Sequence, residues 1–303
     1  MDESLLIDFH NLAFRMFFAK EVGAYTVNPD IYLWRFMVFD SIFKLLTKFD
    51  EVKEVIIAVD DKNSWRKSYF NRYKESRKKT RLKQKDVDWE LLYKTINNFT
   101  ADLKHYLPFK VLKVRSSEAD DIIAILSKNC KCIISSNDED YLQLSSDNVK
   151  IWNPSKNIFV ECNDTSKFLL MKCLTGQAKD DIFNVKTPNE WGLTKETEGK
   201  RKPGLGDVTA QKILLEGLDK WLEKNTSVKV NDIVTDYSKN FKRNKILIGF
   251  EYIPLTIKNR VIEQYNAYSF PPPENILEFF KKYKMNKFIE NFHNVERRLM
   301  ELY

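Results

Sequence analysis

The chain has 303 residues, of which 43% are hydrophobic and 13% aromatic, so it can form one large domain or two modest ones with a substantial core. Its 8 Gly and 9 Pro argue against a loop-rich or disordered chain, and no apolar run approaches the roughly 18 residues of a membrane-spanning helix. The N-terminus has no signal pattern, and the four cysteines have no metal-ligand spacing. We therefore expect a soluble cytoplasmic protein with free thiols.

Positive charge is concentrated in one segment. The net charge is +7, but residues 62–85 alone hold 11 Lys and Arg with a single acid, Glu75, so the remainder of the chain is net negative. A local basic segment on an otherwise acidic protein predicts a polyanionic partner. The alternative is a solvated helix or loop with no partner. Four aromatic residues lie among these charges and can either stack on bases or pack the segment onto the protein: Trp65, Tyr69, Phe70 and Tyr73.

Strands and helices are expected to alternate in the first half of the chain. The expected strands are residues 4–8, 55–59, 109–114 and 131–135, and the expected helices are 31–49, 88–106 and one that begins near Glu118. This alternation predicts an α/β fold with a twisted, mostly parallel sheet and helices on both faces.

Acidic side chains gather where these strands end. Asp8, Asp60, Asp138 and Asp140 follow strands, and Glu118, Asp120 and Asp121 open the helix near residue 118. Parallel strands end at one edge of a sheet, which is where open α/β sheets bind ligands. Two carboxylates about 4 Å apart repel by about 4 kcal/mol at an effective dielectric of about 20, so cations must neutralise such a group. Each acid alone could be a cap or turn residue, but together they predict one site.

The second half of the chain is expected to be mainly helical. A helix over residues 163–175 should stop at Gly176, before a turn that carries Asp180 and Asp181. The part beyond residue 215 is expected to be helical to Tyr303.

A Gly-x-Gly turn at Gly204 and Gly206 runs into an amphipathic helix that ends near residue 215. Backbone N–H groups of such a turn can hold a phosphate. Basic residues flank it and favour this interpretation: Lys200, Arg201, Lys202 and Lys212.

The chain offers few groups for acid–base or nucleophilic catalysis. No Ser/His/Asp or Cys/His arrangement is visible, the P-loop pattern is absent, and the three histidines (His10, His105 and His293) are expected to be structural. What remains is an all-carboxylate site, whose natural ligands are Mg²⁺ and Mn²⁺. Two such ions roughly 4 Å apart can activate water and stabilise the leaving oxygen in phosphodiester cleavage.

Seven motifs follow one another along the chain. They read LLIDF, VIIAVD, WRKSYFNRYKESR, EADDIIA, SSNDEDYLQL, a Gly-x-x-x-Asp-Asp turn and PGLGDVTAQKILL. This order resembles the 5′-nuclease (flap endonuclease) family over nearly the whole chain. LIGFEYIP and the Pro-rich turn after Tyr265 are most similar to the ribonuclease H branch of T-even-type bacteriophages. The resemblance implies a PIN-like sheet, a basic arch and a mainly helical C-terminal part.

The resemblance also implies an activity. It is that of a Mg²⁺-dependent, structure-specific 5′ nuclease, with Mn²⁺ as a substitute, which removes RNA primers and adjacent DNA during replication. Such an enzyme is a 5′ to 3′ exonuclease and flap endonuclease with ribonuclease H activity on RNA–DNA hybrids. Its substrates are branched or nicked duplex DNA and hybrids with 5′ ends or flaps. The same resemblance implies a monomer in the host cytoplasm, with a sliding clamp and a single-strand-binding protein as partners.

Matching the family's motifs assigns roles to the acids. The first metal would be held by Asp8, Asp60, Asp120 and Asp138, the second by Asp140 and Asp180, and Glu118 and Asp121 would act through water. One position departs from the pattern. The family's second-metal turn reads Gly-Asp-x-x-Asp-Asn, whereas this chain has Gln177 after the glycine and Lys179 before Asp180. We expect the second ion to bind more weakly unless Asp181 compensates.

The same matching assigns a nucleic-acid interface. Tyr73, Lys74 and Arg77 fit the family's Tyr-Lys-x-x-Arg arch motif, in which Lys74 would approach the scissile phosphate, and Arg66 and Lys67 would bind the strand or order the arch. The duplex would lie on Gly204, Gly206 and Lys212, in a turn (203–208) that in the family often also holds K⁺. The implied domains are a nuclease domain, 1–181, with its arch at 62–86, and a helical DNA-binding domain, 182–303, with a helix-turn-helix-like motif at 199–216.

Two other functions stay open. A member that lost efficient catalysis through Gln177 would only recognise branched DNA, and its cleavage would return in Gln177→Asp. A compact PIN-type ribonuclease would cleave single-stranded RNA without a duplex. The C-terminal half disfavours it, because such proteins do not need one. Phe279 and Phe280 are expected to be core residues rather than a clamp-binding peptide.

Overall fold

The computed structural model describes residues 3–24, 29–195 and 197–303. It divides into two compact units. The first consists of Met1–Ser64, Arg81–Glu161 and Leu255–Tyr303, and the second of Trp65–Thr80 and Cys162–Pro254. The expected domains were 1–181 and 182–303; in this division residues 65–80 and 162–181 fall in the second unit and residues 255–303 in the first.

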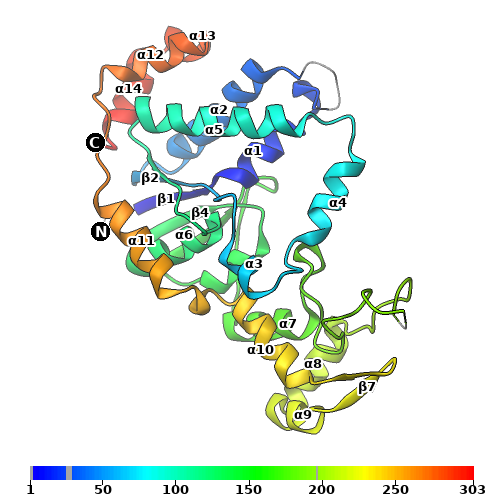
Figure 1. The fold of residues 1–303 in the computed structure, drawn as a ribbon. Helices are drawn as coiled ribbons and strands as arrows, with labels where there is room; N and C mark the ends of the chain where they lie inside the picture. Colours follow the sequence, from blue (N-terminus) through cyan, green and yellow to red (C-terminus); the bar gives the residue numbers. More distant parts are fainter. Residues whose placement is uncertain (1–2, 25–28, 196) are drawn as a thin grey trace. The chain divides into compact units, whose positions relative to one another are not determined.

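The first unit is built on a six-stranded sheet (Figure 1). Its strands are β1 (Glu3–Asp8), β2 (Val52–Ala58), β3 (Lys110–Leu112), β4 (Lys131–Ser135), β5 (Val149–Asn153) and β6 (Ile158–Val160). Their order is β3-β2-β1-β4-β5-β6, and every neighbouring pair is parallel except β5 and β6. The expected mostly parallel sheet is confirmed. The chain builds outward from β1 first on one side and then on the other, so the carboxyl ends of β1 and β4 form a topological switch point.

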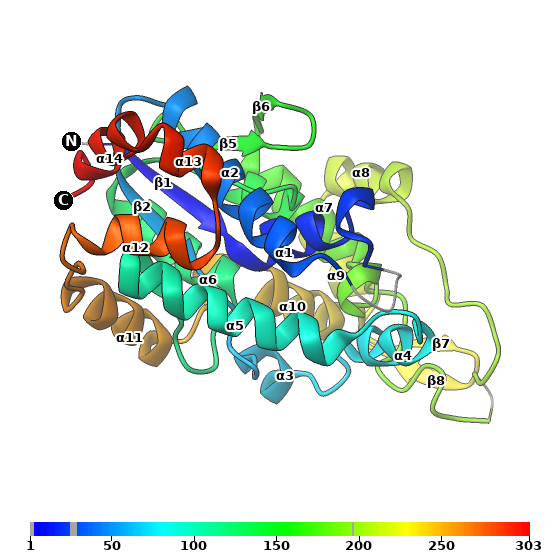
Figure 2. The same cartoon turned by 90° about the horizontal axis from the view of Figure 1, so that it is seen from above.

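Helices cover both faces of this sheet (Figures 1 and 2). One face carries α1 (Phe9–Phe17), α2 (Ile31–Lys48) and α5 (Trp89–Tyr106), and the other carries α6 (Ala119–Leu126) with α11 (Leu255–Asn266) beside it. Asp30 and Asp88 start α2 and α5 by accepting a hydrogen bond from the third N–H along, each at 2.8 Å. Short 3₁₀ helices lie at Lys20–Val22, Ser127–Asn129 and Glu139–Leu144 (η3).

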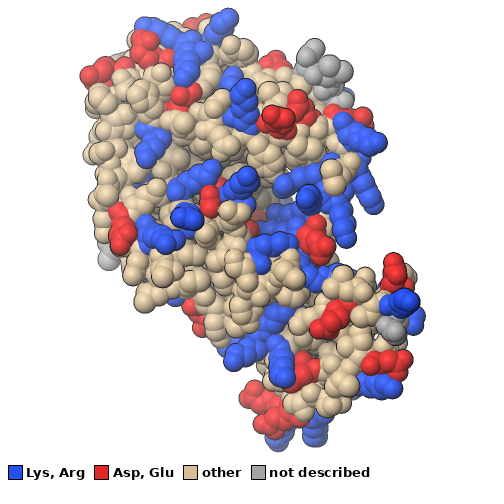
Figure 3. Space-filling view, in the orientation of Figure 1, with Lys and Arg blue, Asp and Glu red and all other residues tan. Residues whose placement is uncertain are grey.

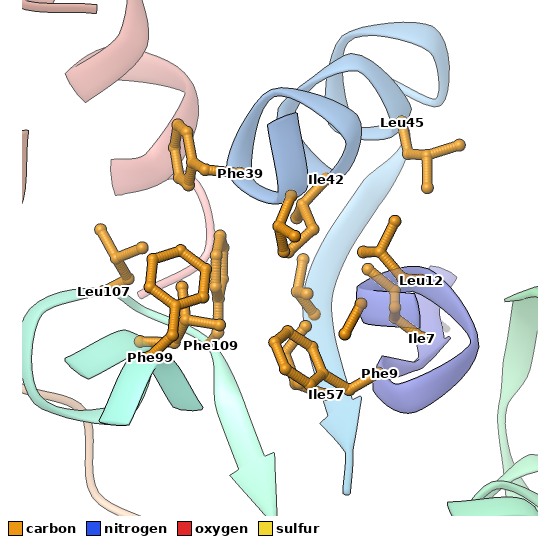
Figure 4. Close-up of a cluster of buried hydrophobic side chains, with 14 of the residues drawn as sticks. Ile7, Phe9, Leu12, Phe39, Ile42, Leu45, Ile57, Phe99, Leu107 and Phe109 are labelled. Atoms are coloured by element: carbon orange, nitrogen blue, oxygen red, sulfur yellow. The ribbon is translucent and has the colours of Figure 1, made fainter. Parts of the chain in front are cut away.

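The core of the first unit lies between the sheet and the first group of helices. Alternate residues of a strand point to opposite faces, so Ile7 and Ile57 join this core, where Phe9, Phe99 and Phe109 are also fully buried (Figure 4).

The last helices complete that core. They are α12 (Asn275–Lys282), α13 (Asn286–Glu290) and α14 (Phe292–Met300), and α12 lies against α5 (Figure 2). Phe279 and Phe280 are 0% exposed, with ring centroids 5.5 and 5.1 Å from that of Phe39. The expectation that both are core residues is confirmed. Their burial is also why residues 255–303 belong to the first unit.

The second unit is mainly helical. It contains α3 (Trp65–Tyr69), the start of α4 (Glu75–Lys83), α7 (Thr165–Thr175), η4 (Ala178–Asp180), α8 (Asp207–Glu216), α9 (Leu218–Lys224), α10 (Tyr237–Ile248) and η5 (Phe250–Tyr252). The helices α7, α8 and α10 enclose a small core that includes Leu174, Ile213 and Phe241.

The expectation of an entirely helical segment after residue 215 is wrong at one place. Val228–Val230 (β7) and Ile233–Thr235 (β8) pair as an antiparallel hairpin. Asn231 and Asp232 between them have φ values of 44° and 66°, the left-handed conformation that a two-residue hairpin turn requires.

Two expectations about the whole chain concern cysteines and membranes. All four cysteines are free. In the described part of the chain, no helix combines the length and the apolar character that spanning a bilayer demands.

Candidate active site

Asp8 occupies the switch point of the sheet, because it ends β1 between the parallel strands β2 and β4. One carboxylate oxygen, Oδ1, caps α1 by accepting from the backbone N–H of Asn11 at 3.1 Å. The other, Oδ2, accepts from the Tyr141 hydroxyl at 3.2 Å and from Ser136 Oγ at 3.4 Å. The same carboxylate therefore starts a helix and faces the strand ends.

The neighbouring acids act on Asp8 electrostatically. Burial, together with the negative charges of Asp60 and Asp138, raises the pKa of Asp8 to about 7, against the hydrogen bonds from Asn11 and Tyr141. A cation bound beside Asp8 would favour its ionised carboxylate.

Asp60 joins the end of β2 to the start of α6. Its Oδ1 accepts from the backbone N–H of Ala119 at 2.7 Å. Its own N–H donates to Nδ1 of His10 at 3.3 Å, and the same nitrogen lies 3.4 Å from Asp60 Oδ2. His10 was expected to be structural only, yet it contacts a predicted metal ligand. The next residue, Asp61, holds the loop before α6 by accepting from Ser116 N–H at 2.8 Å.

Glu118 and Asp121 form a capping box at the start of α6. The Asp121 carboxylate accepts from Glu118 N–H at 2.9 Å, and the Glu118 side chain accepts from the backbone of Asp121. Both residues are buried, whereas Asp120 between them is half-buried. The predicted water-mediated roles of Glu118 and Asp121 stay predictions.

Asp138 and Asp140 lie at the start of η3, just past β4. Asp138 Oδ1 accepts from Asp140 N–H at 2.9 Å, and Asp138 N–H donates to Ser136 Oγ at 3.1 Å. Ser136 in turn donates to Asp8, so this hydroxyl links the ends of β1 and β4.

Tyr141 marks the point at which the acids converge. Its pKa is raised well above the ordinary value, first by burial and then by four negative charges, those of Asp8, Asp120, Asp138 and Asp60. These are the four carboxylates predicted to hold the first metal, and they come from three strand ends and one helix start. Sequence reasoning missed Tyr141, although it directly follows the acidic pair in the NDEDYLQL motif.

These carboxylates suit a hard divalent cation. Among the residues that the structure describes, no three His, Cys, Asp or Glu side chains already stand at metal-ligand spacing. All-oxygen donors are the preference of Mg²⁺ and Mn²⁺. Burial, and then the charges of Asp60 and Asp138, raise the pKa of Asp8, and a nearby cation would oppose this effect. The donor set therefore fits such an ion.

In the second unit, the predicted second-metal turn follows α7. A side chain at Gly176 would meet the Ile182 carbonyl at 2.3 Å, and its φ of 71° also favours glycine. Gln177 pairs with Ile182 through two backbone hydrogen bonds of 2.8 and 3.0 Å, which close the turn. Asp180 is 5% exposed within it.

The arch is anchored on this turn. The arch residues Lys74 and Ser76 donate their backbone N–H groups to the Asp180 carbonyl at 2.9 Å and to Asp181 Oδ2 at 2.7 Å. The Arg77 guanidinium donates from Nη2 to Asp180 Oδ1 at 2.6 Å. Asp181 thus caps the start of α4.

Other predicted arch residues pack inside the second unit. Arg66 is 1% exposed and donates from Nε to the Leu247 carbonyl at 2.8 Å, and Tyr73 is 4% exposed in a cluster with Leu247. Lys67 donates from Nζ to the Tyr73 carbonyl at 3.1 Å. These contacts are of the kind expected of residues that order the arch. The arch presents its charge further along, where Lys and Arg gather over α4 (Figure 3).

The Gly-x-Gly turn opens α8 as expected. Added Cβ atoms at Gly204 and Gly206 would meet nothing within 4 Å, so the backbone there is open to a ligand. Leu205 between them is buried and anchors the turn. Lys212 is exposed one turn into α8, and its Nζ lies 3.7 Å from Oε1 of Glu216.

Two family models match the chain. Residues 3–169 match the model of the 5′-3′ exonuclease N-terminal resolvase-like domain, and residues 165–295 match that of the T4 RNase H C-terminal domain. The chain belongs to the 5′-3′ exonuclease family. It is therefore a nuclease, an enzyme that cleaves phosphodiester bonds, as the motifs predicted.

Individual members of the 5′-3′ exonuclease family agree. Ribonuclease H of Enterobacteria phage T4 is 30% identical over 244 residues, which cover 77% of this chain and 76% of the relative. Flap endonuclease Xni of Shewanella halifaxensis is 32% identical over 177 residues, 56% of this chain and 63% of the relative. The flap endonuclease of bacteriophage T5, solved as a pseudo-enzyme-product complex with DNA and metal ions, superimposes with a TM-score of 0.62. It covers 93% of this chain and 98% of that protein at 17% identity, and so confirms the fold alone.

Proposed function

We propose that this chain is a Mg²⁺-dependent, structure-specific 5′ nuclease. It acts as a 5′ to 3′ exonuclease and flap endonuclease that removes RNA primers and adjacent DNA during replication. The convergence of four carboxylates on Tyr141 carries the proposal, because a nuclease with no histidine or cysteine centre needs cations and these acids would hold one. The T4 and Shewanella relatives support the substrate class, since their names specify ribonuclease H and flap endonuclease.

The proposed roles follow the two units. In the first, Asp8, Asp60, Asp120 and Asp138 would hold a Mg²⁺ ion, with Asp140 toward a second. Such ions supply an activated water and stabilise the leaving oxygen. In the second, Asp180 would bind the second ion, Lys74 and Arg77 would contact the phosphate strand, and the open turn at Gly204 and Gly206 with Lys212 would hold the duplex, with K⁺ beside it.

The proposed partners are nucleic acids with 5′ ends or flaps. A sliding clamp and a single-strand-binding protein are proposed as further partners only because the chain resembles a phage ribonuclease H. A clamp contact would need residues other than Phe279 and Phe280, since both are buried. A monomer that works in the cytoplasm of the host is proposed on the same ground.

Asp120→Asn tests the proposal. The variant keeps the shape of the side chain but removes a charge that a cation needs, so we expect at least about a hundredfold loss of flap cleavage in Mg²⁺. Binding of flap DNA should change by less than about threefold, because phosphate contacts dominate affinity. The control is Asp147→Asn at an exposed position before β5. Normal cleavage by Asp120→Asn would refute the assignment.

One observation favours a second candidate, a branched-DNA-binding protein with weakened catalysis. Gln177 brings no charge to the second-metal turn, and Arg77 already neutralises Asp180 there. Flap cleavage in Mg²⁺ and in Mn²⁺ separates the candidates. An inactive wild type that regains cleavage in Gln177→Asp would favour the binding protein, and an active wild type would dismiss it.

A further inference from the structure

A predicted metal ligand and a predicted phosphate-binding residue are paired with each other in the second unit. Arg77 Nη2 donates to Asp180 Oδ1 at 2.6 Å, and Arg77 Nε donates to the Lys179 carbonyl at 3.4 Å. The Asp180 side chain is only 8% exposed, whereas that of Arg77 is 43% exposed. The guanidinium therefore covers the carboxylate from the solvent side and uses an oxygen that a cation would need.

The other polar groups of the turn contact either the arch or the turn itself. The Asp181 carboxylate, the only other acid of the turn, caps α4 through Ser76 N–H at 2.7 Å. The Gln177 carbonyl accepts from Asp180 N–H at 3.1 Å and from Ile182 N–H at 3.0 Å. Because Gln177 is neutral and Asp181 caps α4, an ion at this turn would have to use Asp180, which is already paired with Arg77.

We propose that Arg77 is the resident cation of Asp180, so that a second divalent ion binds there only by displacing it. Binding of the ion and release of the arch arginine are then a single exchange. The inference rests on the proposed function in one respect, that Asp180 is a ligand of the second ion.

The exchange has two consequences. Charge-assisted pairs of guanidinium and carboxylate are among the stronger hydrogen-bonded contacts, so the second ion binds less tightly than a bare Asp180 would allow. Coupling between two ligands is reciprocal: whatever draws Arg77 away, such as a phosphate, tightens the ion at Asp180 by the same factor. The position of Arg77 in the arch and the affinity for the second ion are thereby coupled.

Mn²⁺ binding to the full chain without nucleic acid tests the exchange, by calorimetry or by the electron paramagnetic resonance signal of free Mn²⁺. Arg77→Gln removes the guanidinium that competes for Asp180. We therefore expect the more weakly bound Mn²⁺ ion (the weaker ion) to bind about three- to tenfold tighter, the range set by a partly exposed ion pair. Arg77→Lys keeps a charge but loses the forked geometry and should fall between. Lys78→Gln removes the same charge from the exposed neighbouring position and should change the affinity by less than about twofold.

Asp180→Asn completes the design, because it removes the ligand itself. The weaker ion should be lost in this variant, with or without Arg77→Gln. Equal effects of Arg77→Gln and Lys78→Gln, no change in Arg77→Gln, or a weaker ion that survives Asp180→Asn would each overturn the exchange.

Flap cleavage by the same wild-type preparation separates this inference from the proposed function. A chain that cleaves no flap but shows the Arg77→Gln effect keeps the exchange and loses the nuclease assignment. A chain that cleaves flaps without that effect keeps the nuclease assignment and loses the exchange.

Discussion

Tyr141 contacts Asp8, one of the predicted metal ligands. Its hydroxyl donates to Asp8 Oδ2 at 3.2 Å, and this hydrogen bond opposes the burial that raises the pKa of Asp8 to about 7. The hydroxyl therefore favours the ionised form of Asp8, the form that binds a cation.

Tyr141→Phe should weaken Mg²⁺ binding most at low pH. Without the hydroxyl, the pKa of Asp8 rises above about 7, so a proton competes with the ion at higher pH than in the wild type. We expect the Mg²⁺ concentration for half-maximal cleavage at pH 6.5 to rise about tenfold, as for a hydrogen bond to a charged group, and the difference to shrink by pH 8.5.

Tyr268→Phe is the matched control for that variant. It removes a hydroxyl in the segment after α11 that donates to the Phe109 carbonyl at 2.7 Å, a contact that does not involve the acids. If both variants shift the Mg²⁺ requirement alike, or if the Tyr141→Phe shift is the same at both pH values, the role of Tyr141 is wrong.

At the residue scale, the sequence predicts positions better than contacts. Asp8, Asp60 and Asp138 could be assigned because strands of a parallel sheet end at one edge. The Arg77–Asp180 pair joins residues 103 apart in the chain, and the cap from Asp181 to Ser76 joins residues 105 apart. Nothing local in the sequence signals either contact. The sequence therefore suggests Asp181 only as an additional ligand of the second ion.

At the element scale, the arch helix α4 depends on a cap from another segment. Asp181 itself has a φ of 57°, a left-handed conformation that Asn and Asp tolerate better than most residues. The family's Asn and this chain's Asp both provide a side-chain oxygen at this position.

Asp181→Asn and Asp181→Ala should therefore differ. Asparagine keeps an acceptor for Ser76 N–H, whereas alanine loses the cap and is strained at positive φ, at a cost of about 1–2 kcal/mol to α4 docking. We expect trypsin to cut within residues 77–85 about tenfold faster in Asp181→Ala, with little change in Asp181→Asn. Equal cutting rates for the two variants would show that the carboxylate does not order the arch.

The elements that sequence patterns predicted are those with strong periodicity and clear caps. The helices expected over residues 31–49 and 88–106 are α2 and α5, and each begins after a capping aspartate. The strands β7 and β8 were missed because each has only three residues, although VKV and IVT around Asn-Asp form a hairpin signal. The strands β5 and β6 were not predicted either; β6 is a three-residue edge strand.

At the scale of the whole molecule, one ion-pair cluster attaches the last helices to α2. Asp40 accepts from Lys287 of α13 at 2.8 Å and lies 2.6 Å from Lys44 Nζ. Burial alone would raise the pKa of Asp40, but the two lysines outweigh it and lower the pKa. A carboxyl with a lowered pKa stabilises the fold above its unfolded value of 3.8, and this contribution is lost as pH falls through the folded pKa.

Asp40→Asn should thus destabilise the protein in a pH-dependent way. We expect a loss of about 1 kcal/mol at pH 7 in urea unfolding, a modest value because solvent screens a partly exposed cluster. The difference from wild type should shrink below pH 3.8 as the unfolded carboxyl becomes protonated. Asp147→Asn serves as the control, and a pH-independent loss would contradict the ionic origin.

The order of segments in the two units has a consequence for how the protein is made. Residues 162–254 of the second unit lie in the chain between the sheet and the helices α12–α14 that close its core. Synthesis proceeds at about 5–20 residues per second. Residues 162–254 are therefore made before Phe279 and Phe280, which cover Phe39 and Phe99 in the finished core. A ribosome that stops early would release a chain with these aromatic rings uncovered, which makes unfinished products a natural target for chaperones and proteases.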